Sequence, residues 1–226
     1  MKLLDYQNER INLIKKILPK LGDRFILKGG TALTLFYSID RFSEDIDLDV
    51  IKGNMNITNL LDNPGYDIWN INIKKNTDTV FRVMIDYGAE NFKGKYPLKI
   101  EISSRNSKNI LSGYMKYKKI NGVYVYTLEE LANQKIDAFS GRQKIRDFFD
   151  IGMLIQKNIN LFNKDQLLRI KTAIDYKGME ELSYLLKIEI KEHKLKEIDS
   201  EYFVLDVVNK IEDKLYKNLN NKLSWS

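Results

Sequence analysis

The stretch FILKGGTALTLFY (Phe25–Tyr37) and the stretch RFSEDIDLD (Arg41–Asp49) that follows it decide how this chain folds. A short apolar run ends at Gly29-Gly30, and the residues after the glycines have the composition of a helix. Adjacent glycines let the backbone approach a ligand closely, and the free N–H groups of a helix N-terminus favour an anion. We therefore interpret the segment as a strand, a glycine turn and a helix that suit a nucleotide triphosphate.

The second stretch carries three acids at alternating positions. In a strand, alternation places Asp45, Asp47 and Asp49 on one face and their apolar neighbours on the other. Like charges this close repel each other, and the repulsion grows as water is excluded. A solvated edge strand would tolerate them, but their position 14 residues or so after a glycine turn favours a divalent cation that relieves the repulsion.

Composition limits what kind of metal site the chain can build. It has no cysteine and a single histidine, His193, so thiolate zinc sites, iron–sulfur clusters and most histidine-dependent triads are excluded. A metal must then be held by oxygen, which points to Mg²⁺ or Mn²⁺. We interpret His193 as a surface residue, because it lies in a strongly charged segment.

The overall composition is that of a folded protein rather than a disordered one. The chain has 226 residues, 43% of them hydrophobic, and a formal net charge of +6. It contains no apolar run long enough to span a membrane, and charges begin too early in the N-terminus for a signal peptide. We therefore expect a cytoplasmic protein without membrane partners.

The pattern of apolar residues changes near residue 127. Before it lie short alternating runs, and after it the spacing is helical. The sequence predicts strands at 25–27, 45–50, 68–74, 80–87 and 98–103, and later helices around 164–174, 179–191 and 200–219. Asn121-Gly122 predicts a type I′ hairpin. We expect an α+β catalytic domain over residues 1–126 and a helical domain over 127–226.

The two opening stretches resemble the start of the AbiEii/AbiGii toxin family, a branch of the nucleotidyltransferase superfamily with an hG[G/S] turn, a spacer and a DhD strand. The matching positions are Gly29, Gly30, Thr31, Arg41, Ser43, Asp45 and Asp47. The resemblance implies a nucleotidyltransferase-like mixed sheet with flanking helices and a C-terminal helical lobe. It also implies that Asp45 and Asp47 are catalytic metal ligands, and that the five matching residues before them bind the nucleotide.

Enzymes of this fold usually supply a third carboxylate from a later strand. Glu101, in the run LKIEIS, has the expected form, and Asp86, in VMIDY, is the competitor. We prefer Glu101 as the third metal ligand, because its run ends in a polar segment. Either acid could instead be an ordinary outward-facing strand residue.

A second motif begins at Thr127. Thr127 with Glu130 is a capping-box pattern, so a helix should start at about Leu128. On that helix Lys135 falls on the stripe expected to face inward. A lysine stem that packs while its ammonium reaches solvent, or a pair with a nearby acid, would explain this position.

The family resemblance gives this lysine another explanation. AbiEii-like proteins carry a similar lysine in an L-A-x-K helix followed by R…RD…D, and the lysine and the aspartate of the RD pair are regarded as active-site residues. The matching positions here are Lys135, Arg142, Arg146, Asp147 and Asp150. We expect Lys135 and Asp147 to be catalytic and Arg142 and Arg146 to bind phosphate.

Two alternatives remain open in this motif. Asp147 either orients or deprotonates the attacking hydroxyl, or it holds Lys135 or an arginine in place. Arg146 and Asp150 are spaced i, i+4 and could simply pair with each other.

Residues 91–119 contain eight basic residues and one acid, with tyrosines interleaved. That combination suits a nucleic-acid backbone with stacked bases, although a merely solvated basic surface would look the same. The family resemblance implies a Mg²⁺-dependent toxin that transfers a nucleotide from an NTP, with the tRNA 3′ end as first choice of acceptor and an antitoxin encoded nearby. Transfer to a small molecule or a protein side chain, or a nucleotide-binding module without catalysis, are the alternatives.

Overall fold

The computed structural model describes residues 4–88, 97–142 and 144–223. The chain divides into two compact units. We call the first, residues 2–38 and 42–130, the sheet unit, and the second, residues 39–41 and 131–226, the helical unit. The chain thus enters the helical unit briefly at residues 39–41, long before it continues there from residue 131.

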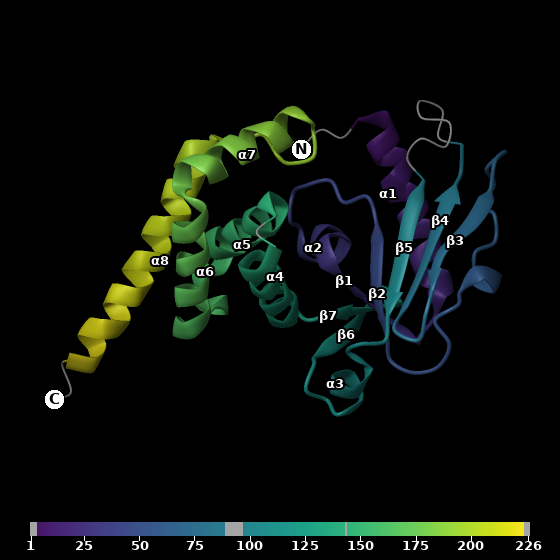
Figure 1. The fold of residues 1–226 in the computed structure, drawn as a ribbon, viewed down its shortest axis with the longest axis horizontal. Helices are drawn as coiled ribbons and strands as arrows, with labels where there is room; N and C mark the ends of the chain where they lie inside the picture. Colours follow the sequence, from purple (N-terminus) through teal and green to yellow (C-terminus); the bar gives the residue numbers. More distant parts are fainter. Residues whose placement is uncertain (1–3, 89–96, 143, 224–226) are drawn as a thin grey trace. The chain divides into compact units, whose positions relative to one another are not determined.

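The sheet unit is built on one mixed sheet of seven strands (Figure 1). The strands are β1 (Phe25–Lys28), β2 (Ile46–Val50), β3 (Asn70–Asn76), β4 (Val80–Asp86), β5 (Leu98–Ser103), β6 (Tyr117–Ile120) and β7 (Val123–Tyr126). Their spatial order is β3-β4-β5-β2-β1-β7-β6. β1 runs parallel to β7 and β2 parallel to β5, whereas the other neighbours are antiparallel. The predicted fold class is confirmed.

The glycine turn and the hairpin form as their residues predict. Gly29 has φ +72°, a value that costs glycine little, and it begins α2 (Gly29–Tyr37) directly after β1. Asn121 and Gly122, with φ 49° and 82°, join β6 to β7, and Ile120 pairs with Val123 across a two-residue loop. In the strand order, β2 lies at the centre of the sheet between β5 and β1, and the glycine turn directly follows β1.

Helices complete the sheet unit. α1 (Asp5–Ile17) leads into a short 3₁₀ helix (Leu18–Leu21), α2 packs on β1, β2 and β7, and α3 (Ser107–Leu111) follows β5. A second 3₁₀ turn covers Thr58–Leu60. The core is aliphatic and aromatic, and its fully buried members include Leu13, Ile14, Ile26, Leu27, Leu33, Ile46, Phe81, Ile100, Ile102 and Tyr126.

The helical unit contains most of α4 (Leu128–Arg142), then α5 (Ile145–Asn158), a 3₁₀ turn (Ile159–Leu161), α6 (Lys164–Lys177), α7 (Met179–Lys191) and α8 (Ser200–Leu223). α4 begins where the capping pattern predicts, because the Thr127 hydroxyl accepts a hydrogen bond from the Glu130 N–H. α6 begins with a reciprocal capping box between Asn163 and Gln166. No described helix is both long enough and apolar enough to cross a membrane.

The largely aliphatic core of the helical unit includes a group of phenylalanine rings, and one glycine lets two helices pack closely around them. The Phe149 and Phe203 rings stack at 5.6 Å, and Phe148 meets Phe203 edge-on at 6.0 Å. A Cβ at Gly152 would lie 2.5 Å from the Phe203 ring and 3.0 Å from Val207. α5 and α8 can therefore approach this closely only because position 152 has no side chain.

Gly152→Ala is expected to lower the free energy of unfolding by about 1–3 kcal/mol, because the added methyl group must displace a buried ring. Gly141→Ala is the matched control: it also lies in a helix, but its Cβ would meet nothing within 4 Å. The control should leave stability unchanged or raise it, since alanine favours helix more than glycine does. Urea unfolding of both variants, followed by circular dichroism, measures the difference, and equal midpoints would contradict the packing explanation.

Candidate active site

Three carboxylates gather on one region of the sheet unit, and we call Asp45, Asp47 and Glu101 the carboxylate cluster. Asp47 on β2 and Glu101 on β5 are register partners in the parallel ladder, so their side chains leave the same face of the sheet. Asp45 lies directly before β2. The competing acid Asp86 is the register partner of Asn70 on β3, and β5 separates its strand from β2. Glu101, rather than Asp86, is thus the neighbour of Asp47.

Two basic side chains, Lys99 and Arg82, form ion pairs with the carboxylate cluster. The Lys99 ammonium lies 2.7 Å from Asp45 Oδ2 and 4.0 Å from Asp47 Oδ1. The Arg82 guanidinium lies 2.6 Å from Glu101 Oε2. Lys99 precedes Glu101 by two residues on β5, so the alternation of the strand puts both side chains on one face. The cluster is therefore arranged around positive charge.

The protonation of Asp47 reflects this crowding. Burial raises the pKa of Asp47 above its ordinary value, and the charge of Asp45 raises it further. The Lys99 ammonium acts in the opposite direction without cancelling the increase. Asp47 thus carries its negative charge at an energetic cost in the folded protein, which a bound cation would reduce.

The donor chemistry of the carboxylate cluster fits a hard divalent ion. Its potential ligands are all carboxylate oxygens, the type that Mg²⁺ and Mn²⁺ prefer, and Asp45 and Asp47 already share one ammonium. Within the described ranges, no three acidic or histidine side chains are brought close enough together to form a ready-made metal site. Asp45 and Asp47, which approach the same ammonium, are two carboxylates that could bind one ion together.

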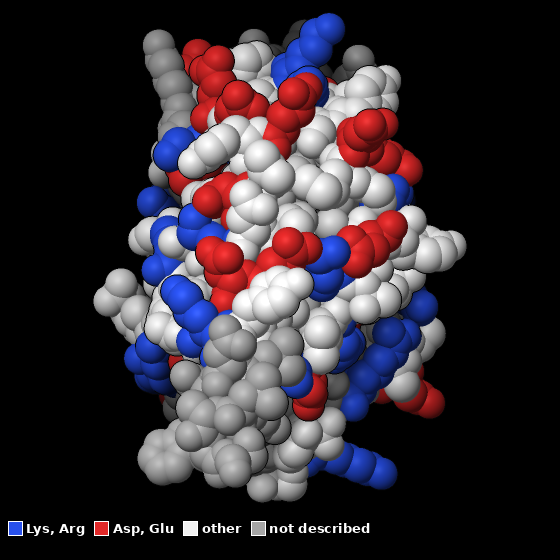
Figure 2. Space-filling model, turned by 90° about the vertical axis from the view of Figure 1, so that its left-hand side faces the viewer, with Lys and Arg blue, Asp and Glu red and all other residues white. Residues whose placement is uncertain are grey.

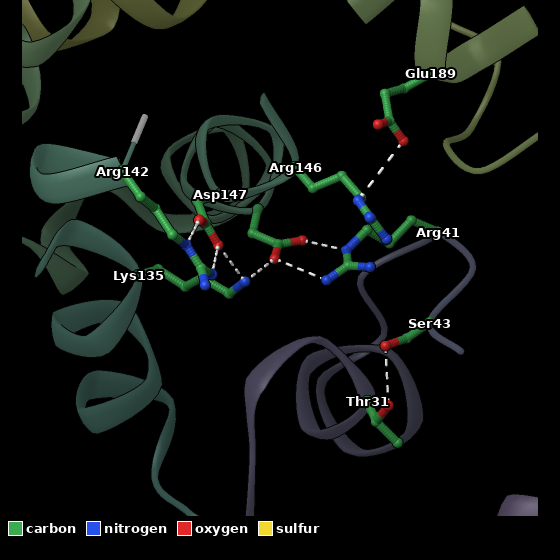
Figure 3. A network of polar contacts seen from close by, with 9 residues as sticks. Thr31, Arg41, Ser43, Lys135, Arg142, Arg146, Asp147 and Glu189 are labelled. Carbon is green, nitrogen blue, oxygen red and sulfur yellow. Dashed lines mark hydrogen bonds and ion pairs between the residues drawn. The ribbon is translucent and has the colours of Figure 1, made fainter. Parts of the chain in front are cut away.

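The glycine turn lies against this cluster. A Cβ at Gly29 would be 3.1 Å from Asp47 Oδ2, so the turn and the carboxylate are in close contact. The Thr31 hydroxyl is buried, lies 2.9 Å from the Ser43 hydroxyl and donates a hydrogen bond to the Asp45 carbonyl oxygen (Figure 3). Thr31 and Ser43 thus hold the segment that carries Asp45, and their hydroxyls are engaged within the chain.

Asp49 shares the alternation of Asp45 and Asp47 but has different surroundings. Its carboxylate is fully buried and accepts hydrogen bonds from Lys28 (2.6 Å), Asn106 (2.7 Å) and the Tyr126 hydroxyl (2.8 Å). Burial and the neighbouring Asp49 charge raise the pKa of Tyr126 far above its ordinary value, so its phenol remains protonated and donates. Asp49 is a structural acid that fixes Lys28 next to the glycine turn.

The helical unit contains a second group of charges, which we call the buried ion network: Arg41, Lys135, Arg142, Asp147 and Asp150. The Lys135 ammonium lies 2.8 Å from Asp147 Oδ1 and 2.7 Å from Asp150 Oδ2. Arg142 binds both oxygens of Asp147, and Arg41 binds both oxygens of Asp150. Figure 3 shows Lys135 and Arg142 converging on Asp147.

Burial makes this network energetically demanding. Lys135 is 8% exposed, Asp147 2% and Asp150 0%. Burial alone would raise the pKa of both aspartates, but Lys135 with Arg142 lowers that of Asp147, and Arg41 with Lys135 lowers that of Asp150. Both acids are therefore held ionised, and the inward-facing lysine predicted from the stripe has two carboxylate partners.

The arginines expected to bind phosphate differ in how accessible they are. Arg41 is buried on Asp150, whereas the Arg142 side chain is 55% exposed while it contacts Asp147. Arg146 Nε lies 3.6 Å from Glu189 (Figure 3). Among the three, Arg142 combines a fixed position with a solvent-facing edge.

Only some of the described basic residues in the segment 91–119 are exposed without an acidic partner close by. Lys99 contacts Asp45, and Lys119 pairs with Asp23 at 2.8 Å. Arg105, Lys108, Lys116 and Lys118 are exposed, as is Tyr114, whereas Lys93, Lys95 and Tyr96 lie outside the described residues. On the side of the molecule that carries α8, Figure 2 shows acidic and basic side chains interspersed with uncharged ones.

Sequence reasoning missed the partners of the predicted acids. Lys99 and Arg82 were not assigned to the site, and Asp150 was matched to the motif without its partner Arg41. The alternation of β5, which puts Lys99 and Glu101 on one face, is a local signal that could have identified Lys99. The pairing of Arg41 with Asp150 spans 109 positions and leaves no local signal.

Comparison with known proteins places these features in a family. The profile described as "Nucleotidyl transferase AbiEii toxin, Type IV TA system" matches residues 13–223. The crystal structure of JHP933 from Helicobacter pylori is 29% identical over 99% of both chains, with a TM-score of 0.79. A second H. pylori structure, of a candidate nucleotidyltransferase, is 30% identical over 95% of this chain and 98% of that one, also with a TM-score of 0.79.

A search of curated proteins finds no match. The family profile nevertheless spans nearly the whole chain, including the glycine turn, the carboxylate cluster and the buried ion network. The chain therefore belongs to the AbiEii family of nucleotidyl transferase toxins of type IV toxin–antitoxin systems.

Proposed function

We propose that the chain transfers a nucleotide from an NTP to the 3′ end of tRNA, and that Asp45 and Asp47 hold the Mg²⁺ or Mn²⁺ the reaction needs. Family membership makes the chain a nucleotidyltransferase and a toxin with a cognate antitoxin. The observation that supports the metal assignment is the contact of both aspartates with one cationic group, directly beside the glycine turn.

Asp45 and Asp47 would hold the ion, with Glu101 as the third carboxylate. Bound there, a divalent ion supplies Lewis-acid stabilisation of the oxygens at the reacting phosphate. Burial and the charge of Asp45 raise the pKa of Asp47, so its ionised form is disfavoured in the folded protein. A bound divalent ion would stabilise that ionised form. Glu101 is positioned next to Asp47 by the strand register and is held by Arg82.

The chemical step is a displacement at the α-phosphate. The oxygen of the acceptor hydroxyl forms a bond to the α-phosphorus, the bond from that phosphorus to the oxygen bridging the β-phosphate breaks, and pyrophosphate leaves with the electron pair. The hydroxyl proton is transferred to a general base. Backbone N–H groups at Gly29 and Gly30, at the start of α2, would bind the phosphates.

The hydrogen bonds of Thr31 and Ser43 support an indirect role for these two residues in the proposed reaction. Both hydroxyls fix the segment that leads into Asp45, so we treat them as positioning residues. The same reasoning applies to Asp147. Its lowered pKa makes it a weak base, and its two contacts hold Lys135 and Arg142. We therefore assign Asp147 the role of orienting Lys135 and Arg142 rather than that of the general base.

The choice of tRNA as acceptor is supported by the exposed basic residues after β5. Arg105, Lys108, Lys116 and Lys118 are exposed around Tyr114, which is 80% exposed. Phosphate contacts from such residues, with a base stacked on the ring, would bind RNA in a salt-dependent way. A small-molecule acceptor would not need this surface.

The decisive experiment incubates the purified protein with each labelled NTP in turn, Mg²⁺ and total tRNA. We expect label on tRNA, and its loss in Asp45→Asn. Asp23→Asn is the matched control, because Asp23 also pairs with a lysine but lies exposed and outside the carboxylate cluster. Label on the protein or on a small molecule would replace the proposed acceptor. Incorporation that persists in Asp45→Asn would contradict the metal assignment.

Gly29→Ala is expected to reduce nucleotide transfer strongly, because the added Cβ would press on Asp47 at 3.1 Å. Gly22→Ala is the matched control: its φ of +74° resembles the +72° of Gly29, but its Cβ would meet nothing within 4 Å. Both substitutions strain the backbone, and Gly22→Ala should lose about 1–3 kcal/mol of stability, because φ +74° with ψ −169° is a conformation that only glycine adopts readily. Only Gly29→Ala should lose transfer, as an assay with labelled NTP would measure, and equal activities would contradict a role for the close contact.

A further inference from the structure

Lys99 forms ion pairs with two members of the carboxylate cluster. Its ammonium lies 2.7 Å from Asp45 Oδ2 and 4.0 Å from Asp47 Oδ1. All three side chains are partly shielded, with exposures of 29%, 31% and 37%. Lys99 therefore offsets part of the negative charge of the two acids when they hold no ion.

An ammonium and a divalent ion compete for the same carboxylate oxygens. Both are compact cations that bind oxygen at short range, at about 2.7–2.9 Å for an ammonium and about 2.0–2.1 Å for Mg²⁺. An ammonium left in contact with Asp45 would also repel a nearby dication, and the repulsion is large in a partly desolvated site. The two cations cannot both be bound to these oxygens without a penalty.

The strand makes Lys99 a persistent competitor. It is tethered to β5, whose pairing with β2 holds the Lys99 backbone close to Asp47 at all times. Arg82 contacts Glu101, and Lys28, whose charge also acts on Asp47, pairs with Asp49, so Lys99 is the lysine whose ammonium reaches both Asp45 and Asp47. A tethered group has a high effective concentration, so its effect on the affinity for a free ion is lasting.

We propose that Lys99 is a built-in competitor of the divalent ion: it offsets part of the charge of Asp45 and Asp47 in the metal-free protein and must leave Asp45 when the ion binds. The proposal rests on the proposed function, in which these two aspartates hold the metal. Lys99 thereby stabilises the empty site and lowers its affinity for free metal.

The test measures binding of Mn²⁺ alone, without nucleotide, by calorimetry and by the electron paramagnetic resonance signal of free Mn²⁺. Lys99→Met should bind Mn²⁺ about tenfold more tightly than the wild type, a conservative size for removing one charge at this distance. Lys119→Met is the matched control. It also removes one positive charge and one ion pair, but β6 lies beyond β1 and β7 from β2, so its affinity should match the wild type.

Thermal unfolding provides a second measurement. Metal-free Lys99→Met should unfold at a lower temperature than Lys119→Met, because Asp45 and Asp47 are left uncompensated, and Mn²⁺ should raise its unfolding temperature more than that of the wild type. Lys99→Arg retains the charge and should keep near wild-type affinity. If Lys99→Met does not fold without metal, Lys99→Gln takes its place in both measurements.

The outcomes separate this proposal from the assignment of the metal ligands. Unchanged or weaker Mn²⁺ binding in Lys99→Met, with binding abolished in Asp47→Asn, would overturn the competitor role alone. Wild-type Mn²⁺ binding in Asp47→Asn would place the metal elsewhere and overturn the proposed function. Tighter binding in Lys99→Met, abolished by the further change Asp47→Asn, would support both.

Discussion

Asp47→Asn is expected to lower nucleotide transfer by about a thousandfold, equivalent to about 4 kcal/mol of transition-state stabilisation. Asparagine keeps the size and shape of the side chain but removes the negative charge that would hold the divalent ion. The contact with Gly29 and the register with Glu101 are preserved, so the loss would report the charge itself. Steady-state transfer from labelled NTP to the acceptor measures it.

The same substitution should not destabilise the protein. The pKa of Asp47 is raised by burial and by Asp45, so at neutral pH the folded state bears the cost of keeping Asp47 ionised. Removing the charge ends that cost, although Lys99 loses part of its attraction. We therefore expect an unfolding temperature equal to or above that of the wild type. A marked fall in that temperature, or activity close to the wild type, would contradict this account of Asp47.

The second large effect is expected in the buried ion network. Asp150→Asn should lower the free energy of unfolding by about 3–5 kcal/mol, because it leaves the buried Arg41 and Lys135 without one of their carboxylates. Asp137→Asn is the matched control, since Asp137 pairs with Arg169 on the surface and both side chains are at least half exposed. The control should change stability by about 0–1 kcal/mol. Urea unfolding at pH 7 measures both.

Acid should reduce the difference between Asp150→Asn and the wild type. The folded pKa of Asp150 lies below its ordinary value of 3.8, so its ionisation stabilises the folded state above that pH. The stabilisation is lost as the pH falls from about 3.8 through the lower folded pKa. The stability difference between Asp150→Asn and the wild type should therefore be nearly equal at pH 7 and pH 4 and smaller at pH 3. A constant difference across this range would argue that the amide disturbs packing rather than charge.

Local patterns predicted the elements of this fold well because each is determined by nearby residues. The alternating run at 98–103 forms β5, Asn121-Gly122 forms a two-residue hairpin loop, and the helix expected at 179–191 is α7. The inward stripe on α4 correctly placed Lys135 in the interior. Smaller differences occur at the ends, where Asp45 precedes β2 and β3 starts at residue 70.

Local patterns could not predict side-chain contacts between residues that are far apart in the sequence. Alternation placed Asp49 with Asp45 and Asp47, but its burial against Lys28, Asn106 and Tyr126 depends on three separate segments. The i, i+4 spacing suggested Arg146 for Asp150, whereas Asp150 binds Arg41 and Lys135. Spacing limits which side chains share a face, but only the folded chain determines which distant charge reaches them.

The short excursion of residues 39–41 into the helical unit also bears on how this family can be recombined. Residues 127–226 alone would contain Asp150 and Lys135 but not Arg41, which supplies two hydrogen bonds to the buried carboxylate. The helical half is therefore not a self-sufficient cassette. A chimera that replaces the helical half of this chain should therefore also replace residues 39–41, so that the arginine and its carboxylate come from one parent.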